Sequence, residues 1–262
     1  MAGQKTPDAK TAAIRAITLK FVVAYAQAAP PREVLKAWMS EWPKVEQDGF
    51  KASAVAYRQD TLAAMGELKR ALSPWEQKVL KADAVTLKAQ DQADATWRIE
   101  AFAALIWALG ALDAPPAFDT QISHDVLTLY PAAGLMETIG GARLRPAIEI
   151  EKARKLAELW HWRSRTRFVT ERGDAFPENP DHAADGIKSF DDIVRNVAAE
   201  AGRRGDVTVI DGDFGALGKA YRDLAPAEWE IVRSIAAERH FALNWLCGYA
   251  KANQWDDTRT DT

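Results

Sequence analysis

Apolar residues recur along most of this chain at the spacing of an amphipathic α-helix. Over residues 8–28, apolar side chains fall three and four positions apart, as Ile14, Ile17 and Phe21 illustrate, which predicts a helix there. Pro30-Pro31 ends that segment, and Pro31 suits the first turn of a second helix. The dominant periodicity is therefore helical from the first residues onward.

Start and stop signals divide the rest of the chain into further helices. Ser73-Pro74-Trp75-Glu76 reads as a capping box with proline at the first helical position, so a helix begins there. Ser123 and Ser189 stand at the N-cap positions of two later helices. Longer helical segments are predicted over residues 52–72, 93–112, 145–169 and 226–253. The pattern predicts about eight to ten helices in a single all-α domain spanning residues 1–262.

Three segments depart from this pattern. Residues 173–188 are rich in glycine, proline, asparagine and aspartate and predict an exposed loop. Residues 207–217 form a β-like stretch, in which Asp211-Gly212 predicts the turn of a small β-hairpin. Residues 254–262 form a polar tail after the last helix. The expected fold is thus all-α with one small β insertion.

Composition excludes several classes of protein. The 262 residues are 48% hydrophobic and 27% charged, which is ordinary for a globular chain. The net charge of -3 supplies no field that draws the chain to nucleic acid or an anionic membrane. Cys247 is the only cysteine, so a disulfide framework is excluded. Basic residues precede an apolar stretch over 17–24, as in a signal segment, but Lys20 interrupts it. We expect a cytoplasmic location and no membrane span.

The chain contains ten tryptophans, and two interpretations fit them. The first is a thick helical core filled with indole rings, which we favour. The second is an aromatic-lined pocket, because ligand pockets favour aromatic walls. Composition leaves both open.

Glu100 is the most informative charged residue. Trp97, Glu100 and Trp107 share one face of the predicted helix over 93–112. A carboxylate between two indoles is desolvated and requires a cation or several hydrogen-bond donors. The candidate partners are Arg163, Arg239 and His240. An ion-paired strut is favoured over an acid–base group.

A basic and aromatic segment surrounds His161-Trp162. Residues 143–172 contain nine lysines and arginines against four glutamates. Such segments can follow a nucleic-acid backbone, but Arg163, Arg165 and Arg167 do not share one helix face. The simpler explanation is that these basic residues lie near the C-terminus of their helix, where positive charge interacts favourably with the helix dipole. No nucleic-acid partner is expected.

Other motifs point to no specific chemistry. His240, Asn244 and Cys247 share a helix face, and these residue types form some thiol-hydrolase triads. A lone cysteine is more commonly a core residue. The carboxylates of the tail match no calcium-binding loop, and the four histidines show no zinc spacing. We therefore expect no metal and no cofactor.

Several stretches together resemble one known family. They are Trp97 to Leu109, Glu238 to Leu246, and Trp255-Asp256-Asp257 closing on Asp261-Thr262, with support from Ser73-Pro74-Trp75-Glu76 and His161-Trp162. In this order they resemble the bacterial domain-of-unknown-function family numbered four-two-seven-two, over most of the chain. The resemblance implies no activity. It implies that the tail at 254–262 is docked onto the helices. It also implies that six residues lie together in the fold: Glu100, Arg239, Asn244, Trp245, Trp255 and Asp256.

Two functional hypotheses follow. The first is a non-enzymatic module that binds a protein or small-molecule partner through its tryptophan-lined groove and tail, as a monomer or a homodimer. Its binding residues are expected among Trp97, Trp107, Arg163, Asn244, Trp245, Trp255 and Asp256. The alternative is an enzyme of unknown substrate. In it Glu100 is the acid or base, Arg239 or Arg163 holds an anion, and His161 or His240 carries a second proton.

Overall fold

The computed structural model describes residues 6–131, 134–177 and 187–260. Within them the chain is mostly helical, with a small antiparallel sheet, which confirms the predicted fold class. The α-helices are α1 (Ala9–Ala28), α2 (Arg32–Glu41), α3 (Lys44–Met65), α4 (Pro74–Lys81), α5 (Ala89–Ala108), α6 (Leu135–Gly141), α7 (Ala147–Glu171), α9 (Phe190–Arg203) and α10 (Pro226–Leu246). The 3-10 turns are η1 (Gly66–Ala71), η2 (His124–Thr128), η3 (Tyr221–Asp223), η4 (Lys251–Asn253) and η5 (Trp255–Asp257).

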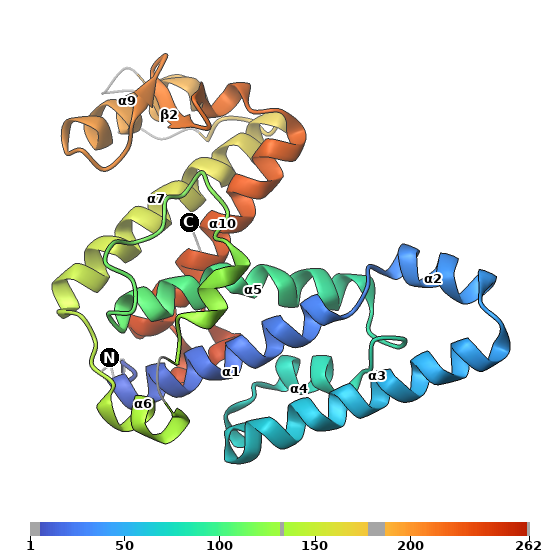
Figure 1. The fold of residues 1–262 in the computed structure, drawn as a ribbon. Helices are drawn as coiled ribbons and strands as arrows, with labels where there is room; N and C mark the ends of the chain where they lie inside the picture. The colour runs from blue at the N-terminus through green and yellow to red at the C-terminus, as the bar shows by residue number, and fades with distance from the viewer. Residues whose placement is uncertain (1–5, 132–133, 178–186, 261–262) are drawn as a thin grey trace.

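Helix α5 lies at the centre of the fold (Figure 1). It packs against α1 on one side and α10 on another, while α10 also packs along α7. Every residue from Ile99 to Ala108 is buried, because these neighbours cover α5 on several sides. A smaller apolar cluster joins α1 to α3 and α4 through residues such as Tyr25, Met65 and Leu80.

The predicted helix starts agree with local capping. Asp8 accepts a hydrogen bond from the Thr11 backbone amide and starts α1. Ser73 and Glu76 form the reciprocal capping box of α4, and Ser189 caps α9. These caps satisfy amide groups that have no partner inside the helix.

Three expected helix boundaries were wrong, both ends of α3 and the end of α10. Helix α3 begins at Lys44, well before residue 52, and gives way to η1 at Gly66, whose φ is 52°. Helix α10 ends at Leu246 instead of Asn253, because Gly248 adopts a φ of 86°, a conformation that ends helices.

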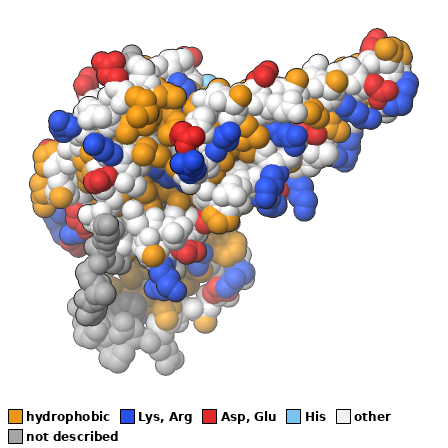
Figure 2. Space-filling view, turned by 90° about the horizontal axis from the view of Figure 1, so that it is seen from below, with side chains coloured by type: hydrophobic (Ala, Val, Ile, Leu, Met, Phe, Trp, Pro, Cys, Tyr) orange, Lys and Arg blue, Asp and Glu red, His pale blue; other side chains and the backbone are white. Residues whose placement is uncertain are grey.

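Helices α2 and α3 project from the body as an arm (Figures 1 and 2). Leu35 is the buried residue of α2, and α3 buries Ala54 and Met65. On the arm, Trp38 stacks on Trp42 with ring centroids 5.5 Å apart. The arm therefore carries aromatic side chains outside the main core.

The β-like stretch forms a three-stranded antiparallel sheet of β1 (Val209–Ile210), β2 (Asp213–Ala216) and β3 (Lys219–Ala220). Asp211 and Gly212 have φ values of 48° and 76°, as a two-residue hairpin turn requires. The expected hairpin is confirmed; the third strand was not expected. Of the loop predicted over 173–188, residues 178–186 lie outside the described residues, and 173–177 contain no helix or strand.

Candidate functional site

Glu100 is enclosed by an ion pair. Arg239 donates to its Oε2 atom from Nε at 2.9 Å and from Nη2 at 2.6 Å. The backbone amide of Ile122 donates to Oε1 at 2.9 Å. Arg239 also donates from Nη1 to the carbonyl oxygens of Pro116 and Ala117, at 2.8 and 2.5 Å. Both carboxylate oxygens are thus occupied, and solvent does not reach the Glu100 side chain.

The other two expected partners of Glu100 lie elsewhere. Arg163 donates from Nε and Nη2 to the two carboxylate oxygens of Asp213, each at 2.7 Å. This buried pair fixes β2 against α7. His240 instead contacts His161. The sequence made both residues candidate partners of Glu100, but helix periodicity does not say which neighbouring helix a side chain meets.

The six residues that the resemblance grouped together form four separate sets, of which the Glu100–Arg239 pair is the first. Asn244 accepts from Arg154 Nη1 at 3.4 Å and donates to the carbonyl of Arg259 at 2.6 Å. Trp245 and Trp255 pack edge to face, 5.3 Å apart. Asp256 accepts a hydrogen bond from the Trp75 amide at the start of α4, at 2.9 Å. Only Glu100 and Arg239 contact each other directly among the acidic and basic members.

Several of the tryptophans fill the core, and one of them lines a pocket whose other walls are mostly polar. Trp107, Trp160, Trp245 and Trp255 are buried in the core. Trp107 also borders a small apolar crevice beside Arg239. Trp97 is half-buried and lines a larger pocket.

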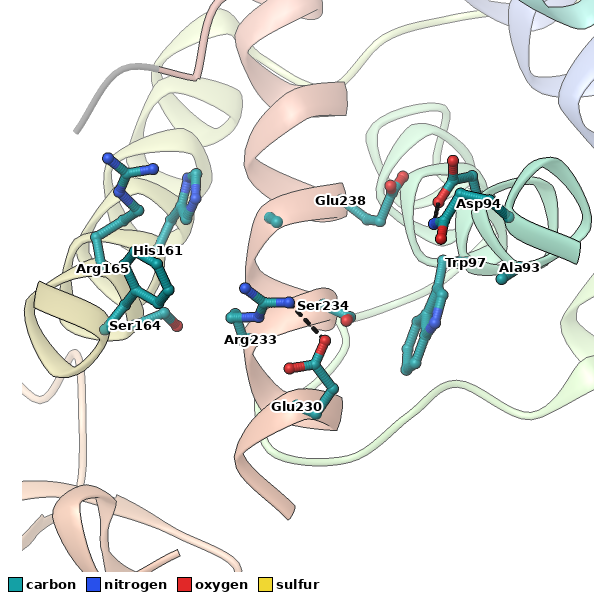
Figure 3. A pocket seen from close by; sticks show the side chains of 13 residues that line it. Ala93, Asp94, Trp97, His161, Ser164, Arg165, Glu230, Arg233, Ser234 and Glu238 are labelled. Carbon is teal, nitrogen blue, oxygen red and sulfur yellow. Dashed lines mark hydrogen bonds and ion pairs between the residues drawn. The ribbon is translucent and has the colours of Figure 1, made fainter. Parts of the chain in front are cut away.

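That larger pocket, hereafter the interhelical pocket, has a volume of about 530 Å³ and lies between α5, α7 and α10 (Figure 3). Helix α5 contributes Asp94 and Trp97, and α7 contributes His161 and Arg165. Helix α10 contributes small side chains at Ser234 and Ala237 together with the charged residues Glu230, Arg233 and Glu238. Its size is within the range of small-molecule sites.

A histidine pair lies behind one wall of the interhelical pocket. His161 Nδ1 and His240 Nδ1 are 2.9 Å apart, so the two nitrogens share one proton. His240 is fully buried, whereas His161 lines the pocket. With its Nδ1 engaged, Nε2 is the ring nitrogen of His161 left for a ligand, as a donor or an acceptor according to which ring holds the shared proton.

Burial keeps both imidazoles neutral. It is the main cause that lowers the pKa of His161 to about 4, with Arg165 and Arg233 adding to the effect. Burial, with His161 and Arg154 nearby, lowers the pKa of His240 to about 3. The pair is therefore an uncharged polar element at neutral pH.

Glu238 is a carboxyl group of the pocket with a raised pKa. Burial raises its pKa, and the charges of Asp94 and Glu100 act in the same direction, while Arg98 opposes them. Arg98 Nη1 lies 3.0 Å from Glu238 Oε2. A carboxyl group with a raised pKa in a pocket is a candidate for ligand binding or proton transfer.

Sequence reasoning missed Asp94, Glu238 and Arg233. Charged residues on a helix usually face solvent, so residue type alone does not mark these three as pocket residues. The available signal was spacing: Asp94 and Trp97 are three apart, and Ser234 and Glu238 are four apart, so each pair shares a helix face. That signal becomes meaningful only once the three helices are known to converge.

Cys247, outside the interhelical pocket, shows no activated thiol. Burial, together with Glu151, raises the pKa of Cys247 to about 12. Among the described residues, no cluster of three or more histidine, cysteine, aspartate or glutamate side chains is arranged to hold a metal ion.

The fold and the pocket define a helical protein built around a buried central helix, with a polar cavity beside it. The chain belongs to the family described as Domain of unknown function (DUF4272), whose model matches residues 50–184, just over half of the chain. The matched segment contains Glu100 and His161 but not α10 or the tail. No curated protein and no solved structure matched the chain.

No single helix of the described residues is long and apolar enough to cross a bilayer; only α1 and α2 taken together, as a bent pair, reach that length and apolar content.

Proposed function

We propose that this chain is a non-enzymatic binding module that takes up a small polar molecule in the interhelical pocket. The observation that carries this proposal is the convergence of α5, α7 and α10 on a cavity of about 530 Å³ lined by titratable side chains. Pockets with a few convergent polar groups and perturbed pKa values are the sites where ligands most often bind.

The hydrogen bonds that Glu100 accepts favour the binding module over an enzyme that uses Glu100 as its acid or base. Both of its oxygens accept hydrogen bonds from Arg239 or the Ile122 amide. A general acid or base must lie within hydrogen-bond reach of a substrate. Glu100 and Arg239 are thus better suited to holding α5 and α10 together than to proton transfer.

The test blocks the pocket without removing a charge. Ala237→Trp places an indole in the interhelical pocket, whereas Ala227→Trp makes the same change at an exposed position of α10 outside it. A library of small polar metabolites is screened by ligand-observed NMR. We expect compounds that bind the wild type and the Ala227→Trp variant but not Ala237→Trp. The absence of any compound with that profile would refute the proposal.

One observation favours a second candidate, an enzyme that uses His161. His161 lines the pocket, and His240 occupies its Nδ1, so Nε2 is the ring nitrogen left for a substrate. Glu238, whose pKa burial raises, is a second titratable group in the same cavity. In this candidate enzyme His161, and not Glu100, is the residue that transfers the proton. Turnover of a ligand found in the screen, lost in His161→Gln while binding persists, would favour it over the binding module.

Location and assembly belong to the same proposal. We expect the chain to act in the cytoplasm, because its single cysteine gives it no need of an oxidising compartment. We expect a monomer or a homodimer, with neither nucleic acid nor membrane as a partner. Cell fractionation and sedimentation velocity test these expectations; recovery in a membrane fraction would contradict them.

A further inference from the structure

The charges of the interhelical pocket are segregated by wall (Figure 3). Asp94 on α5 and Glu238 on the α5-facing side of α10 form an acidic wall. Arg165 and the neutral His161 on α7 form the opposite wall. Glu230 and Arg233 lie between them on α10 and pair with each other at 2.5 Å. The pocket therefore has an acidic end and a basic end.

Two of these charges have no ion-pair partner in the part of the chain that the structure describes. Glu238 is paired with Arg98 and Glu230 with Arg233. Asp94 accepts a hydrogen bond from Gln90 Nε2 at 2.7 Å, but no cation lies within ion-pair distance of it among the described residues. Arg165 is exposed and likewise meets no carboxylate there. Among the described residues, one carboxylate and one guanidinium without an ion-pair partner thus stand on opposite walls.

The acidic wall is suited to a cation. Asp94 and Glu238 are close enough that Asp94 helps to raise the pKa of Glu238, so a positive charge between them would relieve their repulsion. Trp97 lies on the same wall, and indole rings attract ammonium groups. The opposite wall offers a guanidinium and an imidazole nitrogen, both of which bind carboxylates.

We infer that the ligand of the interhelical pocket is a small zwitterion, whose ammonium group lies between Asp94 and Glu238 and whose carboxylate lies against Arg165 and His161. This inference rests on the proposed function, because it assigns the chemical class of the ligand for the same pocket. A ligand that carries both charges satisfies both walls at once, whereas a singly charged ligand leaves one free charge unpaired.

The experiment uses matched probes. The zwitterions are glycine, β-alanine, γ-aminobutyrate and ε-aminocaproate, which differ in the separation of their charges. Each is compared with the alkylamine and the carboxylate of the same chain length, by NMR titration at low ionic strength. For at least one length, the zwitterion is expected to bind about tenfold more tightly than either singly charged analogue, the change that one added charge-assisted contact gives.

Charge-neutralising variants assign each end of the ligand. Asp94→Asn should abolish the preference for the zwitterion over the carboxylate, and Arg165→Gln should abolish the preference over the amine. Asp60→Asn on α3 and Lys155→Gln on α7 are matched controls at exposed positions outside the pocket, and neither should change any affinity.

The outcomes separate this inference from the proposed function. If library compounds bind in a manner blocked by Ala237→Trp, but no zwitterion binds better than both analogues, the zwitterion inference is overturned and the binding module stands. The zwitterion inference is also overturned if the preference survives in both Asp94→Asn and Arg165→Gln. If no compound binds the pocket at all, both proposals fail.

Discussion

Glu100 and Arg239 lie 139 positions apart in the chain and form an ion pair that is almost completely shielded from solvent, with Nη2 2.6 Å from Oε2. The pair joins the central helix α5 to α10. Through Nη1, Arg239 also holds the carbonyl groups of the segment after α5. One guanidinium thus organises two helices and the connection that covers them.

Neutralising Glu100 should therefore destabilise the fold. In Glu100→Gln the guanidinium of Arg239 stays buried without a counter-charge, which costs about 3–5 kcal/mol for comparable pairs. Urea unfolding measures the loss. Glu33→Gln removes one carboxylate of the exposed Lys36–Glu33 pair and should change the free energy of unfolding by less than about 0.5 kcal/mol. A stable Glu100→Gln protein that has lost its ligand would contradict the structural role.

The sheet should depend on a second buried pair. Burial acts to raise the pKa of Asp213, but hydrogen bonds and the charge of Arg163 outweigh it and hold that pKa below its usual value. Asp213→Asn leaves Arg163 buried and unpaired, so we expect a loss of about 3–5 kcal/mol. Hydrogen exchange should rise first over residues 209–220. Unchanged exchange there would show that the pair does not anchor the sheet.

The tail should stabilise α4 through one hydrogen bond. Asp256 accepts from the Trp75 amide, one of the amides at a helix N-terminus that lack a partner within the helix. Asp256→Ala should cost about 1 kcal/mol, as loss of a helix cap does. The neighbouring Asp257 is exposed and provides the control, because Asp257→Ala removes the same charge from the tail. Equal effects of the two changes in thermal unfolding would exclude a specific cap.

Local signals predicted the elements better than their ends. The capping residues Ser73 and Ser189 identify helix starts because a cap involves only residues three positions apart. The start of α3 was placed too late because residues 44–51 are mostly polar. In an arm that projects from the body, a helix needs little apolar surface, so periodicity underestimates its length.

Contacts between distant residues were predicted only in part. The need of Glu100 for a cation followed from its apolar neighbours, and Arg239 was one of three candidates. The choice among them depends on how α5, α7 and α10 cross, which no local pattern encodes. The pocket was missed for the same reason: Asp94 and Glu238 are 144 positions apart, and only the packing of their helices brings them to one cavity.

The histidine pair should make stability fall as the solution becomes acidic. The pKa of His161 is lowered from 6.5 to about 4 in the folded chain, mainly by burial. Between these values the unfolded chain binds more protons than the folded chain, so the free energy of unfolding decreases as pH falls through that window. Below about pH 4 the full effect of this imidazole is roughly 3 kcal/mol, and the lowered pKa of His240 acts in the same direction.

Urea unfolding at about pH 7 and about pH 5 tests this dependence, because the lower value lies inside the window. The wild type should lose more stability between the two conditions than a His161→Gln, His240→Gln double variant, whose amides keep hydrogen-bonding groups without titrating. His124→Gln is the control, since His124 is exposed and has no buried partner among the described residues. If wild type and double variant lose the same stability, both imidazoles are free to take up protons in the folded chain. Protonation in the folded chain would add positive charge beside the interhelical pocket at acidic pH. That result would contradict the conclusion that burial keeps both imidazoles neutral.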